Sequence, residues 1–125
     1  MLFAVEATRR WTDDGITSNA LMPGGIWTNL QRHWNPDVLA STRESVPAVT
    51  ATGMGVKTPE QGAATTVLVA TSPALDGIGG RYFEDCREAE VVDRVSDGLH
   101  GVCGYALDPD AAERLWDVSR ELLRA

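Results

Sequence analysis

Lysine is almost absent from this sequence of 125 residues, and positive charge is thinly spread. Lys57 is the only lysine, ten arginines are scattered along the chain, and the acidic residues outnumber Lys and Arg by 18 to 11. The formal net charge is −7 at pH 7, whereas binding a nucleic acid requires cations that neutralise its phosphates. We therefore expect no nucleic-acid partner.

Metal-binding residues and long apolar runs are also scarce. Cys86 and Cys103 lack CxxC spacing, and His33 and His100 have no acid or cysteine at a ligand interval, so we expect no metal site. No apolar run approaches the length of a membrane span, and Glu6 places a charge too early for a signal-peptide core. These features favour a cytoplasmic protein without membrane association, in which the cysteines stay reduced. A structural disulfide between them is the alternative.

The composition, 43% hydrophobic and 23% charged, is that of a single globular domain. The pattern predicts a helix over residues 2–11, a strand over 16–22, a partly helical loop region over 29–55, a helix ending near 71, a strand over 81–83, an irregular segment over 84–105 and a final helix after Asp108. Strands that alternate with helices favour a parallel sheet, hence an α/β fold.

Two features indicate that this sheet is incomplete. The strand over residues 16–22 is apolar enough to expect a neighbour on each edge, yet the sequence offers one partner strand. The first helix has no capping residue, so Met1 stands where a helix interior is expected.

The first strand runs directly into Pro23-Gly24-Gly25, which Ile26 and Thr28 follow. Glycine lacks the Cβ that would block a close approach to the backbone, and open α/β sheets bind ligands at the carboxyl ends of their strands. The segment is interpreted either as a ligand-binding loop or as a plain turn that ends a strand.

Four segments together resemble the C-terminal part of short-chain dehydrogenase/reductases, in the branch of retinol-dehydrogenase-like and WW-domain-oxidoreductase-like enzymes. They are ITSNALMPGGIWTNL, TPEQGAATTVLVATSP, GGRYFEDC and DPDAAERLWDVSREL. The resemblance implies part of a Rossmann-type parallel sheet, with two strands and three to four helices, and the NAD- or NADP-dependent oxidation of an alcohol or reduction of a carbonyl. It also implies that Pro23, Gly24, Ile26 and Thr28 contact the cofactor. In the family, the backbone after the Pro-Gly turn forms hydrogen bonds with the nicotinamide carboxamide.

Two elements of that family are absent. The glycine-rich cofactor turn should follow a strand, but the glycines at 77–80 precede one, and no tyrosine lies four residues before Lys57. Tyrosine and lysine in a Tyr-x-x-x-Lys pair supply the acid/base chemistry, so we expect no catalytic residue in this chain and no activity from it alone. A truncated gene, a misassigned start codon or a fragment would each explain the pattern.

The resemblance divides the chain into one partial domain over 1–125, with a substrate-loop region over 29–57 and a C-terminal extension with a helix over 84–125. Trp27, Trp34 and Leu39 imply a small apolar alcohol or carbonyl substrate in the parent enzyme, although core packing explains these side chains equally well. An alternative is a non-catalytic module that pairs with a full-length homologue or a separate N-terminal half, through its strand edge or first helix. A third possibility is the tail of a misannotated reading frame.

Overall fold

The computed structural model describes residues 1–51, 56–94 and 100–124. The fold is mixed α/β, as predicted. The α-helices are α1 (Leu2–Trp11), α2 (Pro36–Ala51), α3 (Pro59–Thr71) and α4 (Pro109–Leu122). The strands are β1 (Ala20–Met22), β2 (Tyr82–Glu84), β3 (Arg87–Glu88), β4 (Val91–Val92) and β5 (Val102–Cys103). Four short 3₁₀ helices are described, η1 (Thr12–Asp14), η2 (Asn29–His33), η3 (Pro73–Leu75) and η4 (Gly104–Leu107). None of the described helices is long and apolar enough to cross a bilayer.

The central sheet has the strand order β1-β2-β3. β1 and β2 are parallel, with Ala20 opposite Tyr82 and Met22 opposite Glu84, and β3 pairs antiparallel with β2. The predicted parallel pairing is therefore confirmed. In the part of the chain that the structure describes, no strand pairs with the other edge of β1.

The first strand is shorter than the predicted range of 16–22, and side chains contribute to the hydrogen bonds of the residues just before it. The Thr8 hydroxyl of α1 donates to the carbonyl of Ser18 and accepts from its N–H, each at 2.9 Å. The Asn19 amide donates to the Ile78 carbonyl and accepts from the Arg81 N–H, also at 2.9 Å. The Ser18 carbonyl also accepts a backbone hydrogen bond of 2.7 Å from Gly80, and the regular pairing of β1 with β2 begins at Ala20.

The prediction of an irregular segment over 84–105 is wrong for its described part. The chain reverses at Asp85 and Cys86, which have positive φ angles of 46° and 61°, and this tight turn pairs β2 with β3. Tight hairpin turns of this kind are usually marked by Asn-Gly or Asp-Gly, a signal that Asp-Cys does not give. β4 and β5 then form a second, parallel pair.

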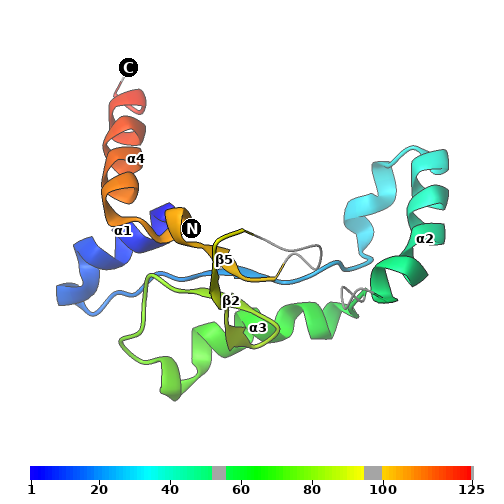
Figure 1. Ribbon diagram of the computed structural model, residues 1–125, viewed down its shortest axis with the longest axis horizontal. Coiled ribbons are helices and arrows are strands. Elements are labelled where there is room, and N and C mark those ends of the chain that lie inside the picture. The colour runs from blue at the N-terminus through cyan, green and yellow to red at the C-terminus, as the bar shows by residue number, and fades with distance from the viewer. Residues whose placement is uncertain (52–55, 95–99, 125) are drawn as a thin grey trace.

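The helix starts are as predicted. The Thr58 hydroxyl accepts a hydrogen bond from the Gln61 N–H, and the Gln61 side chain accepts one from the Thr58 N–H, which together make the capping box of α3. The Asp108 carboxylate accepts from the N–H groups of Asp110 and Ala111 at the start of α4. α3 contacts both β1 and β2. In Figure 1, α1 and α4 lie at one end of the molecule and α2 at the other.

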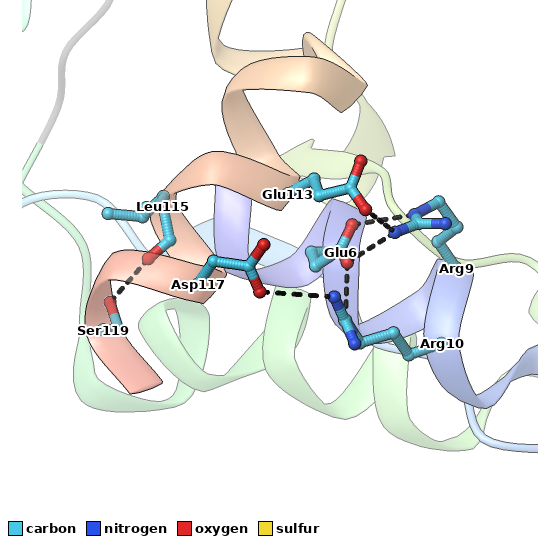
Figure 2. Close-up of polar contacts among 7 residues, drawn as sticks. All are labelled: Glu6, Arg9, Arg10, Glu113, Leu115, Asp117 and Ser119. Atoms are coloured by element: carbon cyan, nitrogen blue, oxygen red, sulfur yellow. Dashed lines mark hydrogen bonds and ion pairs between the residues drawn. The ribbon is translucent and has the colours of Figure 1, made fainter. Parts of the chain in front are cut away.

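α1 and α4 are joined by charged side chains around a fully buried carboxylate (Figure 2). Glu6, 0% exposed, accepts two hydrogen bonds of 2.8 Å from Arg9 and one of 2.5 Å from Arg10. Arg9 and Arg10 also pair with Glu113 and Asp117 of α4, at 3.1 and 3.9 Å. The hydrogen bonds from Arg9 hold the pKa of Glu6 below its ordinary value, against the effect of burial.

Aromatic packing completes the contact between these helices. Trp116 of α4 lies 5.9 Å from Phe3 and 5.4 Å from Trp11, measured between ring centroids. The spacing of Leu115, Val118 and Leu122 in the sequence predicts an apolar stripe on α4. This stripe is not the inner face of the helix, because Val118 is 47% and Leu122 73% exposed. The helix packs instead through Trp116 and the fully buried Ala112.

Candidate cofactor loop and adjoining pocket

The loop after β1 starts with a glycine that no other residue can replace without strain. Gly24 has a φ of +92°, in the left-handed region that side chains disfavour, and a Cβ there would lie 3.0 Å from Cδ and Cε of Lys57. Gly25 has no such constraint, because nothing lies within 4 Å of a Cβ placed on it. Gly24 therefore fixes the path of the loop.

Lys57 holds the loop in place through its backbone. The backbone N–H of Lys57 donates to the Gly25 carbonyl at 2.8 Å, and Lys57 forms an isolated parallel bridge with Ile26, which extends the line of β1. Its Nζ pairs with the Asp85 carboxylate in the β2–β3 turn, and this hydrogen bond lowers the pKa of Asp85. Sequence reasoning did not find this role, since the two paired residues lie 28 positions apart.

The Ile26 side chain packs on α3 at a glycine. A Cβ on Gly62 would lie 2.1 Å from Cδ1 of Ile26 and 2.7 Å from its Cγ1, so only glycine admits the isoleucine in its present position. Gly62 is buried within the first turn and a half of the helix. A glycine inside a helix lowers its stability relative to alanine. The presence of Gly62 within a predicted helix was therefore the sequence signal for a close contact at this position.

Thr28 and Gln31 organise the far end of the loop. Thr28 is the N-cap of η2, and its hydroxyl accepts a hydrogen bond from the Leu30 N–H at 3.1 Å. The Gln31 side-chain oxygen accepts from the Thr28 N–H at 2.9 Å, while its Nε2 donates to the Ile26 carbonyl at 3.0 Å. The loop backbone therefore binds a primary carboxamide through one acceptor and one donor. The T-x-x-Q spacing of a capping box was the sequence signal for this arrangement.

The four predicted site residues thus have different surroundings. Gly24 and Ile26 are half-buried and held by Lys57 and Gly62, whereas Pro23 and Thr28 are exposed. The carbonyl of Ile26 and the N–H of Thr28 converge on one amide group, that of Gln31. The structure adds Gln31, Lys57 and Gly62 to the predicted set as residues that shape the loop.

A pocket of about 600 Å³ opens beside Thr28. It is lined by residues of the loop, η2, α2 and the start of α3, namely Trp27, Thr28, Asn29, Gln31, Arg32, Leu39, Arg43 and Pro59. Trp27 and Leu39 line it as the sequence led us to expect, while Trp34 packs edge-on against Trp27 at 6.4 Å between centroids. Five of its eight lining residues lie in the predicted substrate-loop region of 29–57, and Thr28 belongs to the predicted cofactor set.

Among the described residues, the cysteines and the metal-binding side chains do not assemble into a reactive centre. Cys86 and Cys103 are both free, so the alternative of a disulfide is not realised. In the described residues, no three His, Cys, Asp or Glu side chains are grouped as metal ligands. Burial and the nearby Glu84 raise the pKa of Tyr82, which makes its hydroxyl a weaker acid than usual.

The sequence is similar to named oxidoreductases over nearly all of its length. It is 49% identical over 126 residues to a probable oxidoreductase of Streptomyces antibioticus, a match that covers 100% of this chain and 42% of the relative. It is 40% identical to the short-chain dehydrogenase/reductase prx1 of Penicillium rubens, over 94% of this chain and 34% of the relative. It is 33% identical to human retinol dehydrogenase 14, over 98% of this chain and 32% of the relative.

Over nearly all of its length, the chain is similar to the C-terminal portion of short-chain dehydrogenase/reductases. The resemblance seen in the four sequence segments is thereby confirmed. The chain spans less than half the length of these dehydrogenase relatives. No family model and no solved structure matches the sequence.

Proposed function

We propose that residues 23–28 form the nicotinamide-contacting loop of an NAD- or NADP-dependent short-chain dehydrogenase/reductase that oxidises an alcohol or reduces a carbonyl. One observation carries this proposal. The loop already holds a primary carboxamide, that of Gln31, between the Ile26 carbonyl and the Thr28 N–H. Nicotinamide presents the same chemical group, so the residues present fit the cofactor.

Each residue of the loop has a defined task in this proposal. The Ile26 carbonyl accepts a hydrogen bond from a carboxamide NH₂, and the Thr28 N–H donates one to the carboxamide oxygen. Gly24 keeps the approach free of a Cβ, and Lys57 and Gly62 fix the path of the backbone. NAD(P)(H), when bound, supplies the hydride chemistry of the reaction. Gln31 has to withdraw its side chain for the two backbone groups to become available.

The remaining assignments rest on the resemblance. Residues 29–57 are proposed as the substrate-loop region and 84–125 as a C-terminal extension that packs on α1. The chain alone is expected to be inactive, because it contains no Tyr-x-x-x-Lys pair to move the substrate proton.

A chimaera tests this proposal. The C-terminal 42% of the Streptomyces antibioticus relative would be replaced by residues 1–125 of this chain, which match it over that length. We expect the chimaera to oxidise NADH or NADPH when aldehydes and ketones are added, and the isolated chain to show no turnover. A Gly24→Val substitution should abolish the activity, while Gly25→Ala, at a position with open space, should keep it. A folded chimaera that never binds either nucleotide would refute the proposal.

A second candidate function, an interaction module, is favoured by the open edge of β1. Ala20 donates to the Arg81 carbonyl on the β2 side at 2.9 Å, so the N–H of Leu21 faces the other edge, which has no partner in the described residues. α1 is a weaker candidate surface, because α4 packs on it. Leu21→Pro should reduce self-association or binding of an N-terminal half in native mass spectrometry, and Leu21→Val should not. A chain that is monomeric at all concentrations and binds no such half would rule this function out.

A further inference from the structure

We propose that the pocket beside Thr28 binds a substrate with an apolar body and an anionic group, and that Arg43 recognises the anion. This inference rests on the proposed dehydrogenase function, because it identifies the substrate class by the pocket next to the cofactor loop. It differs from the sequence-based expectation of a purely apolar alcohol or carbonyl.

Charge is the first reason. Two of the eight lining residues are arginines and none is acidic, although the whole chain has a net charge of −7. The Arg32 side chain is anchored by a hydrogen bond of 2.8 Å from its Nη1 to the Asn29 carbonyl. The pocket is therefore a local positive site on an acidic protein, which is an arrangement that attracts anions.

The geometry of Arg43 is the second reason. Its guanidinium carbon lies 5.4 Å from the centre of the Trp27 ring. A guanidinium held over an aromatic ring by a cation–π interaction still has N–H groups that can donate two parallel hydrogen bonds to an anionic oxygen pair. Within residues 1–51, 56–94 and 100–124, no carboxylate pairs with Arg43. The indole also restricts the side chain, which lowers the entropy lost on binding.

The apolar wall and the size of the pocket are the third reason. Trp27, Leu39 and Pro59 form an apolar lining, and a volume of about 600 Å³ lies within the usual range for small-molecule sites. Thr28 belongs both to this lining and to the cofactor loop, so a ligand anchored on Arg43 lies beside the loop. The shared chemistry is an aromatic or aliphatic body with a carboxylate or phosphate.

The binding of matched probes to the full chain tests this inference. The probes are 2-naphthoate, 2-naphthyl phosphate and the neutral 2-naphthalenemethanol, followed by ¹⁵N NMR at the Trp27 indole. We expect at least one anion to bind roughly tenfold more tightly than the alcohol, and Arg43→Gln to remove that preference while the alcohol binds as before. Arg43→Lys should retain only part of it, because a lysine lacks the planar fork. Arg120→Gln, an exposed change on α4, is the control and should have no effect.

Two outcomes would overturn the inference. Equal affinities for anion and alcohol, or an anion preference that survives Arg43→Gln, would show that the arginine does not recognise the ligand. Displacement of the bound anion by NADH would assign the arginines to the cofactor's phosphates instead. NADH-induced shifts of the Ile26 and Thr28 amides are recorded on the same samples, so that a failure of the pocket is distinguished from a failure of the cofactor loop.

Discussion

Gly62 of α3 lies directly against the Ile26 side chain, so that a Cβ on Gly62 would be 2.1 Å from Cδ1. This contact fixes the loop that we propose for cofactor binding against a glycine of α3. Helix propensity alone predicts that Gly62→Ala stabilises α3 by about 0.5–1 kcal/mol. We expect the opposite, a loss of about 1–3 kcal/mol, because the isoleucine must leave its position in a packed site.

Urea denaturation of the chain measures this effect. Gly25→Ala is the matched control, since its Cβ meets nothing within 4 Å, and it should change the free energy of unfolding by less than about 0.5 kcal/mol. A Gly62→Ala variant that is more stable than the parent would show that the Ile26 side chain can move aside without a loss of stability.

Gln31→Ala should increase the affinity of the loop for NADH several-fold. The substitution frees the Ile26 carbonyl and the Thr28 N–H, which the glutamine now occupies. The matched control is Gln61→Ala, which removes the equivalent capping-box side chain from α3. Both variants should lose about 0.5–1 kcal/mol of stability, but only the first should change NADH binding. A weaker affinity in Gln31→Ala would mean that this side chain organises the loop rather than competing for it.

Glu6→Gln should loosen the contact between α1 and α4 by about 1–3 kcal/mol at neutral pH, because it removes charge-assisted hydrogen bonds to Arg9 and Arg10. The pKa of Glu6 is lower in the folded state than in the unfolded one. Its contribution is therefore complete above the unfolded pKa and is lost as the pH falls through the folded pKa.

The difference in stability between the parent and Glu6→Gln should consequently shrink in acid. Chemical denaturation at a series of pH values from 7 to about 3 measures it. Glu113→Gln, at a half-exposed site, is the comparison and should cost less than about 1 kcal/mol. A Glu6→Gln difference that is the same at all pH values would disprove the linkage.

Cys86→Gly should stabilise the β2–β3 turn by up to about 1 kcal/mol. Cys86 has a φ of +61°, and glycine adopts this conformation without steric cost, so that Asp85 and Gly would form a favourable turn pair. Cys86→Ala keeps the strain and removes only the thiol, so its stability should not increase. Thermal unfolding of both variants decides whether the backbone or the contact of the thiol with Thr65 at 3.8 Å determines stability here.

Local signals in the sequence were sufficient for α1, α3, α4 and parallel pairing, whereas α2 (Pro36–Ala51) lies where only a partly helical loop region was predicted. The capping residues Thr58 and Asp108 lie within the segments that they start, and the predictions made from them are confirmed. The hairpin at Asp85-Cys86 was missed because its positive φ angles occur without a glycine or asparagine. The predicted apolar stripe of α4 was wrong as an inner face, because α4 packs on α1 through Trp116 and Ala112, which lie on another side of the helix.

Only those residues of the candidate site that lie in one short segment of the sequence were predictable. Pro23, Gly24, Ile26 and Thr28 follow one another, so a resemblance could find them, although their contact with a cofactor stays a prediction. Lys57, Gly62 and Arg43 reach the loop and the pocket through tertiary packing, which no spacing in the sequence encodes.

The most direct test of the central claim is a ¹H–¹⁵N NMR titration of the chain with NADH, comparing the parent with Gly24→Val. We predict that the amide resonances of Trp27 and Thr28 and the side-chain amide of Gln31 shift together and saturate, and that Gly24→Val abolishes these shifts. Shifts confined to residues outside 23–31, or identical shifts in Gly24→Val, would contradict the assignment of this loop to the cofactor.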